Sequence, residues 1–241
     1  MEIAKAIVLA GRPDHDRPWP SVRPGPKHLV PVANQPIIFH TLEALRRAGV
    51  LEAIVIVEPD ALHATAAAIG DGSSWGLSVR CALSAPDHSG LAGALVAARS
   101  FVGDEPVIVQ RADSLHRDRI HPYIVRFARD RLDALALRVA NAPRDSRGAP
   151  LAGGYLFSER ALGSLLERPE EIADPLADVM RAGGEVREET IDGCLACHGD
   201  QDQLLEGNRR VLQLVHNNVD PADFPTCEFQ GPVHAHPTVR L

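Results

Sequence analysis

The chain has 241 residues, and 45% of them are hydrophobic while only 4% are aromatic, which suits one large domain with a core of small aliphatic side chains. A formal net charge of −7 and an isoelectric point of about 5.9 argue against a general affinity for nucleic-acid phosphates. No apolar run approaches the roughly 20 residues of a membrane span, and the first residues do not form a basic and apolar leader. We therefore expect a cytoplasmic protein without a nucleic-acid or membrane partner.

The first half of the chain alternates short apolar runs with helical patterns. Such alternation predicts a mostly parallel, Rossmann-like sheet that helices cover on both faces. Residues 12–36 hold seven of the 19 prolines and are expected to form a long loop. We predict strands at 3–9, 53–57, 77–83 and 107–110, helices at 36–48 and 90–101, and Asp60 as the N-cap of a helix after the second strand.

The second half of the chain continues this pattern. We predict helices at 119–132, 158–167, 175–182 and 200–215 and strands at 134–140, 154–157 and 186–191. Asp200 and Gln203 resemble a capping box at the start of the last helix. Residues 1–219 are therefore expected to form one α/β domain, and residues 220–241 a tail that contains proline and histidine.

Candidate ligand-binding residues follow three of the predicted strands. Gly11, Ser84 and Asp113 each come directly or shortly after a strand end. Ligands of parallel α/β sheets bind at the carboxyl ends of the strands, so these residues should lie around one site. Lys27, one of only two lysines among the 25 basic residues, follows a proline in the long loop. It is either a compact ammonium for a phosphate or a solvated loop residue.

The four cysteines are expected to be thiols or ligands rather than a disulfide framework. Cys194, Cys197 and His198 match the Cys-x-x-Cys-His pattern of haem attachment, but that chemistry normally needs export and we expect no haem. Zinc would need a fourth ligand, with His15, Cys227 and His234 as the candidates, and is not expected either.

Eight segments match motifs of one family in chain order. They are 5–11 (KAIVLAG), 26–36 (PKHLVPVANQP), 89–92 (SGLA), 112–114 (ADS), 154–157 (GYLF), 171–174 (EIAD), 193–209 and 231–233 (GPV). These segments resemble the sugar-1-phosphate nucleotidyltransferases, and are most similar to glucose-1-phosphate thymidylyltransferases. The resemblance covers the whole chain and implies a GT-A-like architecture, with residues 231–233 as the remnant of a β-helix start.

The resemblance implies that a sugar 1-phosphate attacks the α-phosphate of a nucleoside triphosphate while pyrophosphate leaves. Such a transfer depends mainly on positioning and on electrostatic stabilisation. The implied phosphate-binding cations are Lys27 and Arg17, and the implied Mg²⁺ ligand is Asp113, which is otherwise a turn-forming residue. The implied nucleotide- or substrate-binding residues are Gly11, Ser84, Gly90, Leu91 and Glu171.

Three departures from the family pattern concern the chemistry. The triphosphate loop, residues 11–17, carries Pro13, Asp14 and Asp16, so it should cradle a triphosphate poorly. The second metal-binding aspartate of the family falls on Cys197, a soft ligand for Mg²⁺. Residues 141–153 replace a longer segment, and no Glu-Lys-Pro motif remains. We therefore expect weak Mg²⁺ binding, and nucleotidyl transfer that is impaired or lost.

Five of the 11 histidines lie on loops that would line the family's pocket: His15, His28, His88, His116 and His198. They are either ordinary polar loop residues or part of a rebuilt site, with His15 and His198 as the candidate catalytic groups. Three functions stay open: a working nucleotidyltransferase, a repurposed enzyme with a His/Asp/Cys site, and a non-catalytic binding protein. In each case the partner is a small phosphorylated or anionic molecule, and a homo-oligomer is left open.

Overall fold

The computed structural model describes residues 3–11, 25–88, 90–116, 119–140, 142, 151–172, 174–195, 201–214 and 228. The strands are β1 (Lys5–Leu9), β2 (Pro31–Val32), β3 (Gln35–Pro36), β4 (Glu52–Val57), β5 (Ser78–Leu83), β6 (Val107–Arg111), β7 (Ser114–His116), β8 (Ala134–Val139), β9 (Ala152–Phe157), β10 (Val186–Ile191) and β11 (Gly193–Leu195). The helices are α1 (Ile37–Arg47), α2 (Leu62–Ile69), α3 (Gly90–Val102), α4 (His121–Arg129), α5 (Glu159–Glu167), α6 (Pro175–Arg181) and α7 (Gln201–Leu214), with 3-10 turns η1 (Lys27–Leu29), η2 (Ser73–Trp75) and η3 (Pro169–Glu171).

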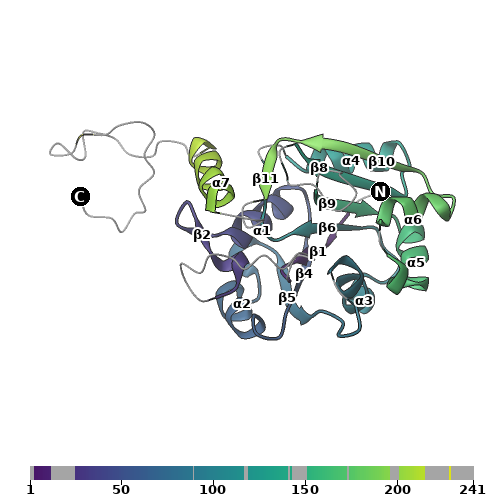
Figure 1. Cartoon of the computed structure of the whole chain (residues 1–241), viewed down its shortest axis with the longest axis horizontal. Helices are drawn as coiled ribbons and strands as arrows, with labels where there is room; N and C mark the ends of the chain where they lie inside the picture. Colours follow the sequence, from purple (N-terminus) through teal and green to yellow (C-terminus); the bar gives the residue numbers. More distant parts are fainter. Residues whose placement is uncertain are drawn as a thin grey trace.

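A seven-stranded sheet forms the centre of the molecule (Figure 1). Its strand order is β10-β8-β9-β6-β1-β4-β5. Strand β1 is parallel to β4 and to β6, β4 is parallel to β5, and β10 is parallel to β8. Strand β9 runs antiparallel to both of its neighbours, β6 and β8. The prediction of a mostly parallel sheet is therefore confirmed.

The two faces of the sheet carry separate apolar cores, because successive side chains of a strand point to opposite faces. In β1, Ala6 and Val8 pack in the core that α1, α2 and α4 cover, whereas Ile7 packs in the core that α3, α5 and α6 cover. Ile38, Leu42 and Leu45 of α1 are all fully buried. Burial of an aliphatic side chain of this size contributes roughly 1.5–3 kcal/mol, so the apolar stripe fixes the helix on the sheet.

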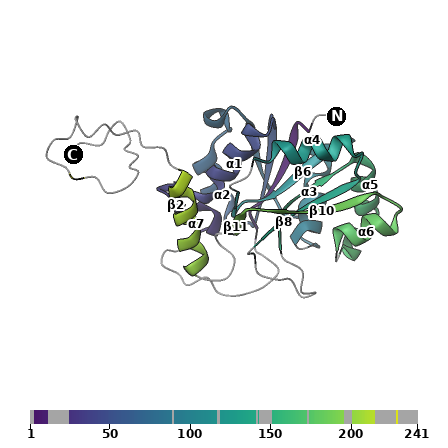
Figure 2. The same cartoon turned by 90° about the horizontal axis from the view of Figure 1, so that it is seen from above.

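A smaller cluster attaches the last helix to the β2–β3 hairpin. Leu204 and Val211 of α7 pack against a cluster that contains Val32. The backbone N–H of Ala33 donates to Asn208 Oδ1 at 2.9 Å. Figure 2 shows α7 lying beside β2, on the other side of the molecule from α5 and α6. In the part of the chain that the structure describes, no helix is long and apolar enough to cross a bilayer.

Several sequence predictions need correction. Asp60 does not cap α2, whose N-cap is Ala61 and has no side-chain cap. The helix predicted over 119–132 is shorter in the structure, where α4 covers only His121–Arg129. The long loop predicted over 12–36 contains η1, β2 and β3 from residue 27 onward. Asp200 and, apart from residue 228, the tail 220–241 lie outside the described residues.

Candidate functional site

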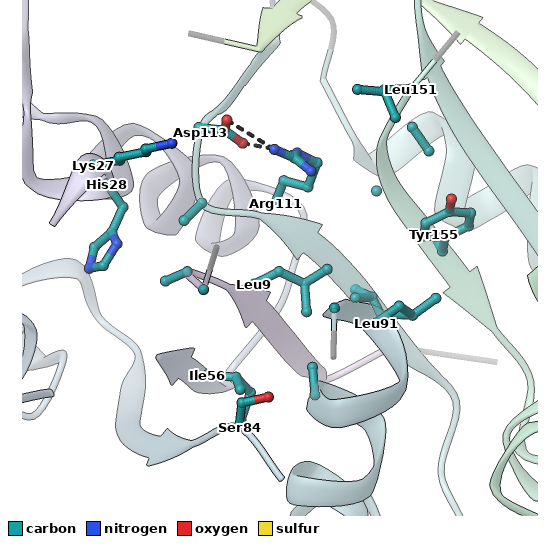
Figure 3. Close-up of a pocket in the computed structure, with 18 of the residues that line it drawn as sticks. Leu9, Lys27, His28, Ile56, Ser84, Leu91, Arg111, Asp113, Leu151 and Tyr155 are labelled. Carbon is teal, nitrogen blue, oxygen red and sulfur yellow. Dashed lines mark hydrogen bonds and ion pairs between the residues drawn. The ribbon is translucent and has the colours of Figure 1, made fainter. Parts of the chain in front are cut away.

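A pocket of about 180 Å³ lies where the carboxyl ends of four parallel strands meet (Figure 3). The register pairs Leu9 with Ile56 and with Arg111, so strands β1, β4 and β6 end at the same level. Gly11, Glu58 and Asp113 follow these ends and line the pocket. The topology therefore brings together residues that lie about 50 positions apart in the sequence.

Helix α3 begins at the rim of this pocket. Gly90 has φ +57°, a left-handed conformation that favours glycine. Gly93, one turn later, lets the helix approach the strand end closely, since a Cβ there would lie 2.5 Å from both Ser84 Oγ and His88 O. Ser84, Gly90 and Leu91 consequently line the pocket together. The first turn of a helix of this length also places unpaired N–H groups and partial positive charge at the pocket.

Asp113 forms a two-pronged ion pair with Arg111. Arg111 Nε donates to Asp113 Oδ1 at 3.0 Å, and the Arg111 NH2 group donates to Asp113 Oδ2 at 3.1 Å. The Asp113 residue is only 8% exposed, and the Arg111 side chain is 20% exposed. Both carboxylate oxygens therefore already accept a hydrogen bond from a positive group, in the geometry that an arginine fork and a carboxylate prefer.

Lys27 and His28 reach the pocket from η1. Lys27 lines the pocket, and its ammonium points toward Asp113 (Figure 3). His28 is 4% exposed, and its Nε2 lies 2.7 Å from Thr65 Oγ1. Burial lowers the pKa of His28 to about 4, although the Ala10 carbonyl and the Asp113 carboxylate favour its charged form. His28 is therefore a neutral wall residue at pH 7 rather than a proton carrier.

The opposite wall comes from β9 and the residue before it. Leu151, Ala152, Gly154 and Tyr155 line the pocket there. Tyr155 stacks on Phe157, with ring centroids 5.6 Å apart. The described lining of the pocket thus combines two cations and two carboxylates with aliphatic and aromatic surface, which suits a ligand with a charged group on a less polar body.

The structure brings most of the described sequence-predicted site residues together. Gly11, Lys27, Ser84, Gly90, Leu91 and Asp113 all line this pocket. Glu171 belongs to η3, and its side chain is outside what the structure describes. His15, Arg17, Cys197 and His198 lie outside the described residues. The expected grouping of Gly11, Ser84 and Asp113 around one site is confirmed, and the functional roles of all six residues stay predictions.

The prediction that His88 and His116 line the pocket is wrong. Neither is among the residues that surround it. His116 lies on β7, where its ring is hydrogen-bonded to the Gln110 side chain and its Nε2 lies 3.0 Å from Ser114 Oγ. Of the described histidines in that group, only His28 faces the pocket, and it is buried and neutral.

Sequence reasoning missed two charged residues of the pocket. Glu58 directly follows the end of β4, just as Gly11 lies close after the end of β1. The expectation that ligands bind at the carboxyl ends of parallel strands therefore applied to Glu58 as well. Arg111 is a charged residue at the end of an otherwise uncharged strand, Val107–Arg111. Such a residue is costly to bury unless it is paired. A charged residue at the end of an apolar strand could therefore have indicated a buried ion pair, and the structure shows that Asp113 is the partner of Arg111.

The described residues do not form a Mg²⁺ site. Mg²⁺ needs hard oxygen ligands with accessible lone pairs in octahedral geometry. Both oxygens of Asp113 accept from Arg111, and the guanidinium would lie next to the ion and repel it. Within the ranges described above, no three His, Cys, Asp or Glu side chains gather in a way that could hold a metal ion. The donor set therefore disagrees with the metal site that the family resemblance implies.

Sequence comparison relates this chain to proteins of known activity. Residues 5–184 match the Nucleotidyl transferase family. The glucose-1-phosphate thymidylyltransferase of Streptomyces griseus is 32% identical, over 90% of this chain and 68% of its own length. The low-salt glycan biosynthesis nucleotidyltransferase Agl11 of Haloferax volcanii is 26% identical, over 87% of this chain and 66% of its own length. The chain thus spans about two thirds of these relatives.

Solved structures share the fold. A Bacillus anthracis protein with the provisional name glucose-1-phosphate thymidylyltransferase, in complex with sucrose, superposes with a TM-score of 0.72 and 23% identity over 86% of this chain and 94% of its own. A UDP-glucose pyrophosphorylase from Acinetobacter baumannii superposes with a TM-score of 0.67 and 16% identity over 88% of this chain and 94% of its own. The sequence match over residues 5–184, the 32% identical relative and this common fold show that the chain belongs to the sugar-1-phosphate nucleotidyltransferase family.

Proposed function

We propose that this chain binds a nucleotide or a phosphorylated sugar in the pocket beside Lys27 and Arg111, and that nucleotidyl transfer to a sugar 1-phosphate is slow or lost. Membership of the family supports a phosphorylated ligand. The composition of the pocket supports it as well, since Lys27 and Arg111 can receive the phosphate while Leu91 and Tyr155 offer surface to a base or sugar.

The ion pair between Arg111 and Asp113 carries the second half of the proposal. Nucleotidyl transfer needs its metal ion to bridge phosphate oxygens and to neutralise charge as it develops. Asp113 is the residue that resemblance assigns to the metal, yet both of its oxygens accept from a guanidinium. Loss of one preorganised electrostatic group typically costs about 10²–10³ in rate. The cysteine at position 197 removes a further hard ligand from the implied set.

The test is a pyrophosphate-release assay. Glucose 1-phosphate and thymidine triphosphate are the first substrates to try, because the Streptomyces griseus relative is a glucose-1-phosphate thymidylyltransferase. The other common triphosphates follow, all with Mg²⁺. We expect the natural chain to turn over near background. The double variant Arg111→Met/Cys197→Asp should gain turnover at saturating substrate, because it removes the competing cation and supplies a second carboxylate, while its KM should rise because Arg111 no longer binds the phosphate.

Each single variant is a control for the double variant, since either change alone leaves the implied metal site incomplete. Arg126→Met is the control for loss of an arginine, because Arg126 pairs with Glu189 on another part of the surface. Turnover of the natural chain at about 1 per second or faster, an ordinary enzyme rate, would contradict the proposal. The plain transferase function would then be the better description.

A further inference from the structure

Arg111 is held rigidly at the polar end of the pocket. It is the last residue of β6, a central strand, and its Cα is in register with Leu9 of the parallel neighbour β1. The backbone N–H of Ala112, the next residue, donates to Leu9 O at 2.9 Å. The guanidinium lines the pocket and is mostly buried. The backbone is fixed in this way and Asp113 holds the guanidinium, so the planar fork needs little ordering to bind two oxygens of one group.

Asp113 occupies the fork as a phosphate would. A carboxylate and a phosphate both offer paired oxygens that an arginine fork binds through two parallel hydrogen bonds. The two N···O distances of 3.0 and 3.1 Å are ordinary for such a pair. Figure 3 shows the Lys27 ammonium pointing toward the same carboxylate. Asp113 would therefore keep a positive neighbour if a ligand phosphate took its place on Arg111.

The charges of the pocket limit the charge of the ligand. Among the described residues that line the cavity, the charged ones are Lys27, Arg111, Asp113 and Glu58. A phosphate monoester carries about two negative charges at pH 7, which two cations can match. A triphosphate carries roughly twice that charge and normally brings a magnesium ion with it. The two cations of the described part of the pocket therefore suit a dianionic ligand better than a triphosphate, whose larger charge they cannot match.

We propose that this pocket binds a dianionic phosphate group without a divalent cation, and that Arg111 takes the phosphate in place of Asp113. The ligand class is a nucleoside monophosphate or a sugar phosphate, whose monoester phosphate carries this charge, or a nucleotide sugar, whose two phosphates carry the same total charge. The inference rests on the proposed function, because it assumes a phosphorylated ligand. It goes further because it names Arg111 as the group that recognises the phosphate and states that binding needs no metal ion.

Calorimetric titration, with EDTA and then with Mg²⁺, tests the inference on the full chain. The probes are thymidine 5′-monophosphate, glucose 1-phosphate and thymidine diphosphoglucose, with thymidine triphosphate for comparison. We expect at least one dianionic probe to bind in EDTA, with a Kd that Mg²⁺ changes less than threefold. The probe that binds most tightly identifies whether the nucleotide, the sugar or both are recognised.

Three variants assign the role of Arg111. Arg111→Met should weaken binding of that probe at least tenfold, whereas Arg126→Met, which loses an ion pair with Glu189 outside the pocket, should change it less than threefold. Asp113→Asn keeps the shape of the side chain and removes the competing charge, so it should bind the probe equally or more tightly. Thermal unfolding by circular dichroism checks that each variant is folded.

The outcomes separate the inference from the proposed function. Binding that is at least tenfold tighter with Mg²⁺ than in EDTA would overturn the metal-free inference and leave the proposed function standing. Metal-free binding that survives Arg111→Met, or that Asp113→Asn abolishes, would also overturn it. If no probe binds in either buffer, both the inference and the proposed function are wrong.

Discussion

Mild acid should destabilise this protein through His28. The side chain is 4% exposed and contacts Thr65. Burial, the largest cause, lowers the pKa of His28 from 6.5 to about 4. The unfolded chain, in which the pKa returns to its ordinary value, therefore binds more protons than the folded chain between these two pH values. The free energy of unfolding should fall as the pH falls from about 6.5 toward 4.

The size of the effect follows from the difference between the two pKa values. Each unit of pKa difference corresponds to about 1.36 kcal/mol. At pH 4.5 the unfolded His28 is almost fully protonated while the folded one is mostly neutral, so His28 alone should cost roughly 2.5 kcal/mol relative to pH 7. That is a large fraction of the ordinary stability of a domain, about 5–15 kcal/mol.

Urea denaturation at pH 7 and at pH 4.5 measures this cost. His28→Gln cannot titrate in this range, so the loss between the two pH values should be smaller for the variant than for the natural chain by roughly 2 kcal/mol or more. His63→Gln is the matched control, because His63 is exposed on α2, and it should follow the natural chain. Parallel losses for the natural chain and for His28→Gln would refute the reasoning.

Three further predictions concern local packing and capping. Gly93→Ala should lower the free energy of unfolding by about 1–3 kcal/mol, because its Cβ would lie 2.5 Å from Ser84 Oγ and His88 O. Gly163→Ala, in the exposed middle of α5 with no atom within 4 Å of the new Cβ, should instead raise it by about 0.5–1 kcal/mol. Asp174→Ala should cost about 0.5–2 kcal/mol, because the Asp174 side chain accepts from the first N–H groups of α6. Urea denaturation at pH 7 measures all three, and equal stability of the two alanine-for-glycine variants would contradict the packing argument.

The main strands and helices could be predicted because their signals are local. Each long strand is a short apolar run, and each long helix has an apolar stripe of helical period. Four short strands, β2, β3, β7 and β11, were missed. Each has only two or three residues, and β7 exists because it pairs with β11, about 80 residues later. Two short strands that pair over such a separation produce no local hydrophobic periodicity in the sequence, so they could not be predicted from it.

The site could be predicted only in outline. The rule about strand ends found Gly11, Ser84 and Asp113, because it depends on topology alone. It could not find that Arg111 neutralises Asp113, since an ion pair depends on side-chain directions. The segment at 171–174 matches a family motif, and in the structure the Asp174 side chain caps the N-terminus of α6. A residue of a family motif can therefore also stabilise the fold at that position.

The change at the site leaves the fold intact for a geometric reason. Val107 and Val109 of β6 pack in the core that α3 covers, and Arg111 continues the same face one step beyond that core. Arg111 ends the strand and Asp113 lies in the turn that follows it, so the two side chains pair outside the core. On the proposed function, a positive charge at the strand end would alter what Asp113 can bind while it removes little from the core. This is how a family scaffold with its sheet order and pocket can carry a different electrostatic site.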